Sequence, residues 1–134
     1  MTYVLDQSYT TVNGGGEAWQ LRQNSGNTVL GTTFTPAKTG NCTKVSNVLF
    51  KTLSPTGNIW AEIHSVDGSN RPTSTILATS TYVDVSTVGT AADTYVDFLF
   101  PTPASLTAET IYAIVLNGDF TIDIHYRFVF GLIR

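Results

Sequence analysis

Charged residues are scarce in this sequence of 134 residues, and that scarcity excludes two broad classes of protein. Only 13% of the residues are Asp, Glu, Lys or Arg, and lysine occurs three times. An average soluble domain has about 25% charged residues, and coiled coils and helix bundles are rich in Glu, Lys, Ala and Leu. Hydrophobic residues still make up 42%, so the chain is also unlike a disordered protein, which combines low hydrophobicity with high net charge.

Cysteine pairs, basic clusters and long apolar runs are also missing. Cys42 is the only cysteine, which excludes an internal disulfide framework. The seven Lys and Arg are scattered and the formal net charge is -3, so we expect no nucleic-acid binding, because that needs a basic patch. The longest apolar run, residues 111–116, is far shorter than the roughly 20 residues of a membrane-spanning helix. The N-terminal residues 1–6 lack the features of a signal peptide, and we expect no membrane partner.

What the sequence has in abundance favours β-strands. It contains 22 threonines and ten serines, with many Val, Ile, Tyr and Phe residues that suit a pleated sheet. Runs of alternating polarity recur at short spacing between turn residues. The predicted strands cover residues 3–8, 19–23, 29–35, 43–53, 58–66, 76–85, 95–100, 110–116 and 121–133.

These strands predict an all-β fold in a single domain that spans residues 1–134. We expect an antiparallel β-sandwich of about eight strands with little or no helix. A jelly roll is the preferred arrangement, because the connections vary in length as Greek-key crossings require.

Turn residues predict how some strands connect. Ser54-Pro55-Thr56-Gly57 suits a type I turn, which should join two paired antiparallel strands. Asn117-Gly118 predicts a tight type I′ hairpin. Pro101 and Pro103 should end the strand that runs through Phe100, because proline cannot donate to a sheet ladder.

Alternation along the strands predicts which side chains are buried. Trp60, Glu62 and His64 should share an outward face. The expected core includes Ile59, Ile63, Val96, Phe98, Phe100, Tyr112, Ile114, Ile124, Phe128 and Phe130.

Several segments resemble a pattern that recurs in one family of β-sandwich domains. The similar segments are residues 5–8 (LDQS), 54–63 (SPTGNIWAEI), 71–73 (RPT), 76–80 (ILATS), 98–100 (FLF), 106–108 (LTA) and 110–116 (TIYAIVL). The chain thereby resembles the jelly-roll domains of phage virion proteins and of bacterial secreted or surface multidomain proteins. Two positions depart from the pattern: Asn47 replaces a usual aliphatic residue and Glu109 a usual glycine. The resemblance implies the fold, and it carries over no catalytic or ligand-binding residue.

Residues able to perform catalysis or bind a metal do not form a convincing set. His64 and His125, the two histidines, lie on predicted outward faces, where we expect them to be solvated beside local carboxylate partners, such as Glu62 for His64. No Gly-x-Ser-x-Gly elbow occurs. Asp67, Ser69 and Asn70 could offer oxygens to Ca²⁺, but a polar turn explains them better. We therefore predict no enzymatic activity, no catalytic residues, no metal and no cofactor.

The predicted interface is an aromatic outer face. If the turn at 54–57 pairs the two strands that it joins, Val48 and Phe50 lie near Trp60 and His64. Exposed apolar patches often mark an interface. Two alternatives remain: the N-terminal segment with Trp19 covers this face, or Trp60 stacks on a sugar ring.

The end of the chain adds a second candidate contact. The apolar residues Leu132 and Ile133 should pair within the sheet or with a neighbouring molecule, because an open edge invites strand addition.

These observations favour a non-enzymatic structural protein of a bacteriophage particle, a capsid decoration or tail-associated protein. The expected partners are further copies of itself in a cyclic oligomer such as a trimer, or a capsid or tail protein. Its expected location is the virion, assembled in the host cytoplasm. The alternative is an extracellular carbohydrate-binding module of a secreted or surface protein, with a glycan as ligand.

Overall fold

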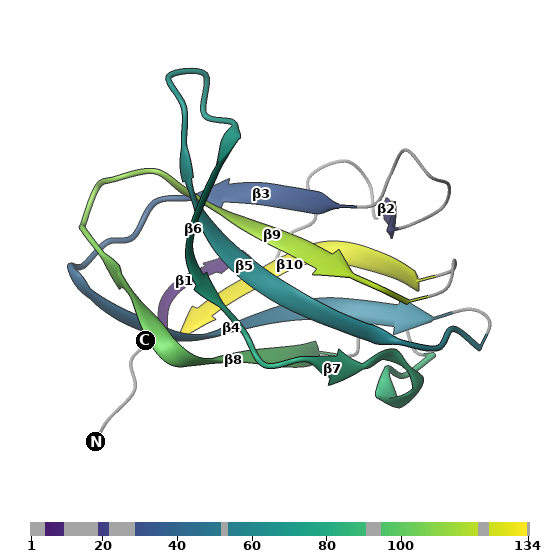
Figure 1. Ribbon diagram of the computed structural model, residues 1–134. Coiled ribbons are helices and arrows are strands. Elements are labelled where there is room, and N and C mark those ends of the chain that lie inside the picture. The colour runs from purple at the N-terminus through teal and green to yellow at the C-terminus, as the bar shows by residue number, and fades with distance from the viewer. Residues whose placement is uncertain are drawn as a thin grey trace.

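Two antiparallel sheets packed face to face make up the described part of the molecule (Figure 1). The computed structural model describes residues 5–9, 19–21, 29–51, 54–90, 95–120 and 124–133, with the side chains of 29, 31–51, 54–90 and 95–120. Sheet A has the strand order β1-β10-β4-β8, with β2 also paired to β10. Its strands are β1 (Leu5–Tyr9), β2 (Trp19–Leu21), β4 (Gly40–Lys51), β8 (Tyr95–Leu106) and β10 (Ile124–Ile133).

Sheet B has the order β3-β9-β5-β6, with β7 also paired to β5. Its strands are β3 (Leu30–Phe34), β5 (Asn58–Val66), β6 (Pro72–Thr79), β7 (Val83–Asp84) and β9 (Tyr112–Gly118). The helical content of the described residues is one short 3₁₀ turn, η1 (Val85–Thr87). The prediction of an all-β sandwich with little or no helix is confirmed.

The pairing of the strands follows a simple rule. Strands from the first half of the chain pair with strands from the second half: β1 with β10, β3 with β9 and β4 with β8. The innermost pair, β5 with β6, is a hairpin. All four pairs are antiparallel, as they would be in one long hairpin, and this hairpin is folded over into two sheets.

The core lies between the sheets and contains the inward residues of both. Ile59, Ala61 and Ile63 of β5 are fully buried and belong to it, and Phe98 and Phe100 of β8 meet them from sheet A. Tyr112 and Ile114 are buried in the same cluster and Val96 packs against it. Seven of the ten predicted core residues are thereby confirmed as inward, and the side chains of Ile124, Phe128 and Phe130 lie outside the described residues.

The prediction that residues 54–57 join a paired hairpin is wrong. β4 belongs to sheet A and β5 to sheet B, so this connection crosses from one sheet to the other. Gly57 adopts a φ of 118°, which glycine tolerates and other residues rarely do. A side chain here would also meet the backbone of Phe120 at 2.6 Å.

The predicted hairpin at Asn117-Gly118 is also wrong. Both residues lie within β9 and pair with Trp60 and Ile59 of β5. Gly118 is needed there because a Cβ would come within 2.6 Å of the Phe120 ring. The glycine therefore makes room for a buried phenylalanine.

Pro101 and Pro103 do not end β8, contrary to the prediction. The strand continues to Leu106, and its pairing with β4 shifts between Cys42 and Lys44. Prolines are tolerated on edge strands and at bulges, and β8 is the last strand of sheet A.

Candidate functional site

A stacked pair of aromatic rings marks the outer face of sheet B. Trp60 of β5 and Tyr82, which lies between β6 and β7, have ring centroids 4.5 Å apart and an interplanar angle of 19°. Trp60 is half-buried, whereas Tyr82 is 60% exposed. One face of the tyrosine ring therefore rests on the indole while much of the rest meets solvent.

The backbone just before Tyr82 is hydrogen-bonded to both sheets. Ser80 N donates to Ala61 O at 2.8 Å, and the Ser80 hydroxyl accepts from Ala61 N at 2.9 Å. Thr81 N donates to Leu99 O of β8 at 2.8 Å. Tyr82 is therefore held by residues fixed to β5 on one side and to β8 on the other.

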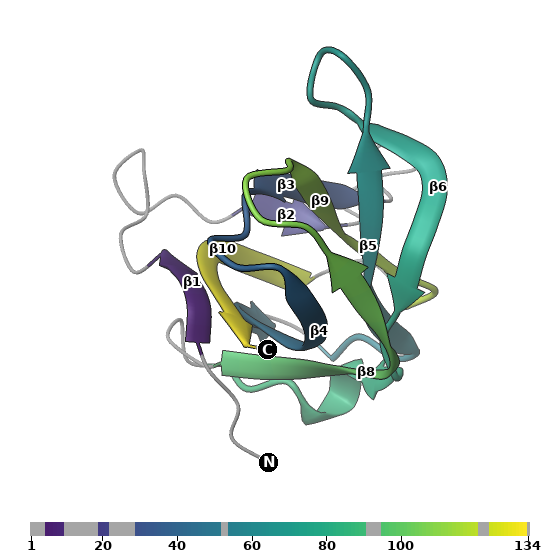
Figure 2. The same cartoon turned by 90° about the vertical axis from the view of Figure 1, so that its left-hand side faces the viewer.

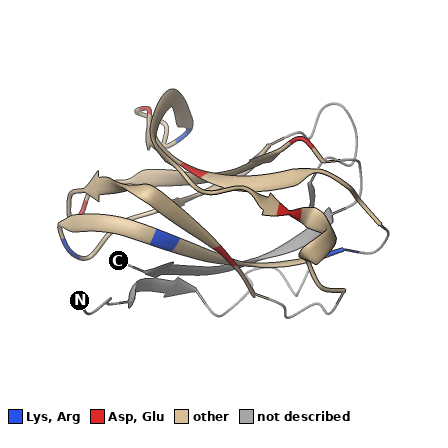
Figure 3. Cartoon of the chain, turned by 60° about the horizontal axis from the view of Figure 1, so that its bottom comes forward, with Lys and Arg blue, Asp and Glu red and all other residues tan. Residues whose placement is uncertain are grey.

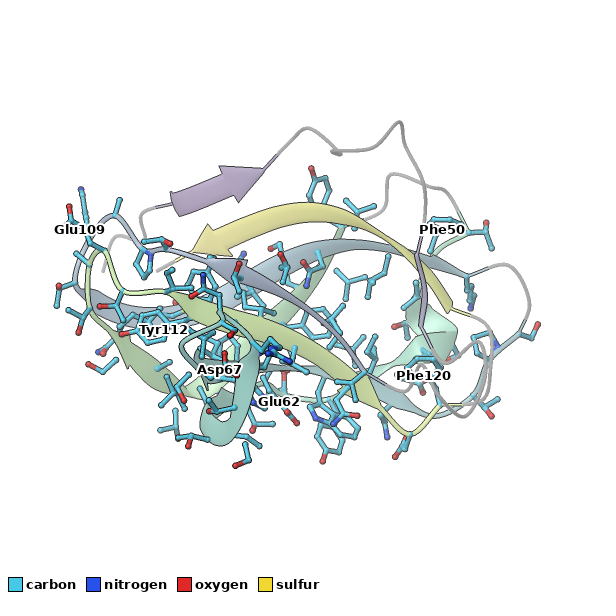
Figure 4. All side chains as sticks on the ribbon, turned by 90° about the horizontal axis from the view of Figure 1, so that it is seen from above. Phe50, Glu62, Asp67, Glu109, Tyr112 and Phe120 are labelled. Carbon is cyan, nitrogen blue, oxygen red and sulfur yellow. The ribbon has the colours of Figure 1, made fainter. Side chains whose placement is uncertain are left out.

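Next to the aromatic pair, polar side chains form a series of hydrogen bonds that runs along β5 from Trp60 and across to β6. Trp60 Nε1 donates to Glu62 Oε2 at 2.8 Å, and Glu62 Oε1 lies 2.8 Å from His64 Nε2. His64 Nδ1 lies 2.7 Å from the carbonyl oxygen of Thr73 on β6. The side chains of Glu62 and His64 are only 10% and 11% exposed, although they face outward from the sheet. Figure 4 labels Glu62 on β5 and Asp67 in the loop that follows this strand.

The partners determine where the hydrogens are in this chain. A carbonyl oxygen only accepts, so His64 Nδ1 carries a hydrogen and donates it to Thr73 O. His64 Nε2 faces a carboxyl oxygen, so one proton lies between these two atoms, on the imidazole or on the carboxyl group. Each hydrogen bond from the indole to Thr73 on β6 then has one donor and one acceptor, and together these bonds fix the orientation of Trp60.

Glu62 and His64 confirm the predicted outward alternation, but the prediction that His64 is solvated is wrong. Its ring is covered because it lies between Glu62 and β6 at a point where the β5–β6 register shifts. The predicted carboxylate partner, Glu62, is correct. His125 lies in β10, and its side chain is outside the described residues.

The predicted single aromatic face does not exist. Val48 and Phe50 lie on β4 in sheet A, whereas Trp60 and His64 lie on β5 in sheet B. Val45 and Leu49 belong to the core and Val48 does not, so Val48 and Phe50 point to the outside of sheet A. Val48 is 3% exposed, and Figure 4 shows Phe50 far along the molecule from Glu62. The four residues therefore lie on opposite faces of the sandwich.

The C-terminal residues are paired on both sides. Leu132 pairs with Val45 of β4 and with Gln7 of β1, and Ile133 pairs with Lys44 and Leu5. Their pairing within the sheet is the first of the two predicted possibilities, and it leaves no open backbone at these positions for a neighbouring strand. Trp19 pairs with Tyr126 at the edge of sheet A, so its backbone does not lie over Trp60.

Exposed apolar side chains also occur on the two strands that end the sheets, which we call the β6–β8 edge: Ile76 and Leu77 of β6, and Tyr95 and Leu99 of β8. These are four of the six large hydrophobic residues that are exposed in the described part of the chain. β6 and β8 are the last strands of their sheets, and they meet where Thr81 bonds Leu99. Figure 2 shows β6 on the right-hand side of the sandwich and β8 along the bottom, and the two strands approach each other at the lower right.

The sequence contained no signal that could have found the β6–β8 edge or Tyr82. Which strands end the two sheets depends on long-range pairing. Tyr82 follows β6 and reaches Trp60 only because Ser80 and Thr81 are fastened to both sheets.

The Asp67 loop is organised as a turn. Asp67 Oδ1 accepts from Ser69 N at 2.8 Å and from Arg71 N at 3.0 Å. Among the described residues no group of three His, Cys, Asp or Glu residues could hold a metal ion. The Ser65 hydroxyl, next to His64 in sequence, bonds the Thr73 hydroxyl at 2.6 Å instead of the imidazole.

Charges are spread thinly over the described surface. Figure 3 shows isolated acidic and basic positions on separate strands and loops. One ion pair crosses sheet A, where Lys44 Nζ lies 3.3 Å from Asp97 Oδ2. Within the described residues, no helix has the length and apolar character to cross a membrane.

Neither protein-family models nor curated protein sequences give a match to this chain.

Proposed function

We propose that this protein is a non-enzymatic structural protein of a bacteriophage particle, a capsid decoration or tail-associated protein that acts through protein–protein contacts. The observation that carries the proposal is that four of the six exposed large hydrophobic residues in the described part of the chain lie on the two edge strands, β6 and β8. An edge strand with exposed apolar residues invites pairing with another chain.

The fold supports the same proposal. The eight main strands, counted along the chain, lie in the order 1-8-3-6 in sheet A and 2-7-4-5 in sheet B. This is the order of a long hairpin wrapped into two Greek keys, and we infer that the domain is a jelly roll, an architecture that viral capsid domains use. The fold alone does not identify a function, so the proposal depends on the exposed apolar residues of β6 and β8.

The edge is suited to a protein partner by its composition. β6 has no charged residue, and β8 has only Asp97. Natural edge strands are commonly protected by lysines, prolines or bulges. In β8 the prolines and the register shift lie in the second half of the strand, beyond Leu99. The first half therefore offers Tyr95 and Leu99 without such protection.

The expected partner is a further copy of this chain in a closed ring, such as a trimer, or a capsid or tail protein. We expect the wild-type protein to associate with itself in sedimentation velocity, or to bind purified capsid or tail proteins encoded beside its gene. Leu99→Asp should weaken that association at least about tenfold, because it places a charge in the contact.

Val29→Asp is the matched control. Val29 is exposed to a similar degree but precedes β3, at the opposite end of sheet B, so this variant should associate like the wild type. A protein that stays monomeric and binds none of the head and tail proteins would contradict the proposal. An equal loss of association in both variants would show that the contact does not lie at the β6–β8 edge.

A further inference from the structure

We propose that the Trp60–Tyr82 pair is a saccharide-binding platform, which takes a neutral sugar ring on the open face of Tyr82. This site lies on the outer face of sheet B, whereas Tyr95 and Leu99 lie on sheet A, and it goes beyond the proposed function. The proposed ligand is a chain of pyranose rings with equatorial hydroxyls, such as a β-linked glucan.

The first argument is the geometry of the rings. Tyr82 is 60% exposed even though it stacks on Trp60 at 4.5 Å. A pyranose with equatorial hydroxyls presents flat faces of C–H groups, whose partial positive charge suits the negative face of an aromatic ring. A tyrosine backed by an indole offers such a face in a fixed position.

The second argument is the supporting hydrogen-bond chain. Glu62 and His64 are almost buried on a face that could have been covered by apolar residues. Burying ionisable groups costs free energy, and an apolar replacement is often neutral or stabilising. These hydrogen bonds fix the orientation of the indole, because Trp60 Nε1 is bonded to Glu62, Glu62 to His64, and His64 to Thr73 O. Such support by surrounding residues is what a binding site needs to hold its contact groups in place.

The third argument is the polarity around the rings. In the register of sheet B, Trp60 lies opposite Asn117 of β9, and Glu62 lies opposite Thr79 of β6. Amide and hydroxyl groups exchange hydrogen bonds with sugar hydroxyls, and a few polar groups beside an aromatic surface are typical of small-molecule sites. Of the carboxyl groups beside the pair, Glu62 is bonded to Trp60 Nε1 and His64 Nε2, and Asp84 is bonded to Ser86 N. The surroundings therefore fit a neutral ligand better than a charged one.

Glu62 and His64 act in this proposal as positioning residues, because they reach the ligand only through Trp60. Glu62→Gln can keep every bond: its amide oxygen accepts from Trp60 Nε1, and its NH₂ donates to a neutral His64 Nε2. Glu62→Ala removes the support of both neighbours. The two variants therefore separate the orientation of the indole from the presence of a charge.

Affinity gel electrophoresis with hydroxyethylcellulose tests the platform, with changes in tryptophan fluorescence as a second readout. We expect the wild-type protein to be retarded and Tyr82→Ala to lose about tenfold or more in affinity. Tyr95→Ala is the matched control, because Tyr95 is 58% exposed but lies on sheet A. Glu62→Ala should bind weakly, and Glu62→Gln should bind like the wild type.

Three results would overturn the proposal. One is no retardation in hydroxyethylcellulose and none in soluble xylan or chitin oligosaccharides, while the protein is folded by circular dichroism. Another is equal loss in Tyr82→Ala and Tyr95→Ala. The third is undiminished affinity in Glu62→Ala, which would remove the role of the hydrogen-bond chain. None of these results affects the association test of Leu99→Asp, so the two proposals fail separately.

Discussion

The β6–β8 edge and the outer face of sheet B both expose large side chains, but they are built differently. On the β8 side of the edge, Tyr95 and Leu99 alternate along the strand with the buried Phe98 and Phe100, and their exposure follows from the strand period. On the face, Trp60 is held by three successive hydrogen bonds that end on another strand. A surface supported only by its strand suits a partner with a strand and apolar residues of its own, whereas a fixed ring suits a small rigid ligand.

The largest expected effect concerns the core beneath the edge. Phe98→Ala removes a fully buried ring and should lower the free energy of unfolding by about 3–5 kcal/mol. Leu99→Ala, one position along the same strand, should change it by no more than about 0.5 kcal/mol. Urea denaturation followed by circular dichroism measures both. Similar losses in the two variants would reverse the assignment of the two faces of β8.

The next effect concerns the hydrogen-bond chain on sheet B. Glu62→Ala leaves both Trp60 Nε1 and His64 Nε2 without their nearly buried partner. We expect a loss of about 2–3 kcal/mol in the free energy of unfolding. Glu62→Gln should lose less than about 1 kcal/mol, because it can reproduce both bonds. If the two variants are equally unstable, the carboxyl group of Glu62 stabilises the protein in a way that its two hydrogen bonds do not explain.

A smaller effect is expected for the ion pair on sheet A. Lys44 and Asp97 are 26% and 53% exposed, and exposed ion pairs contribute about 0–1 kcal/mol. Lys44→Met should therefore change stability by less than about 1 kcal/mol, and less still at high salt. Asp97 also accepts a hydrogen bond from the nearly buried Ser46, so Asp97→Ala should lose more than Lys44→Met. The opposite ranking would show that the ion pair outweighs the serine bond.

The smallest effect is a pH dependence at Asp84. The Ser86 backbone N–H at 2.9 Å, then the Ser86 side chain and Lys51, hold the pKa of the Asp84 carboxyl below its ordinary value of 3.8. The charged form is favoured in the folded protein, so its stabilisation is present above 3.8 and is lost as the pH falls through the lower folded-state pKa. Asp84→Asn should therefore flatten the acid limb of the stability curve slightly. An unchanged acid limb would contradict this role.

The local parts of the structure could be predicted from the sequence, and the distant pairings could not. Strand alternation is a local property, so the inward side of Ile59, Ile63 and Phe98 was predictable. Sheet membership depends on contacts between distant segments. Residues 54–57 have the composition of a hairpin turn, yet they cross between sheets because β4 pairs with β8 and β10. The predicted patch of Phe50 with Trp60 failed for that reason alone.

The candidate site was only partly within reach of the sequence. Trp60 and His64 were predicted on one outward face, with Glu62 beside them. Tyr82 and Thr73 complete the site from segments outside β5, and nothing in their composition distinguishes them from the many other Tyr and Thr residues of the chain. Their roles follow from the hydrogen bonds of Ser80, Thr81 and His64.

The most direct test of the central claim, that the β6–β8 edge is the protein-contact surface, is hydrogen–deuterium exchange of the assembled protein against the dissociated one. Backbone amides of residues 72–79 and 95–100 should become protected on assembly. Amides of β3 at the opposite end of sheet B should exchange at the same rate in both states. Protection confined to the amides of β3, or to those of the central strands β5 and β9, with none in β6 and β8, would contradict the account.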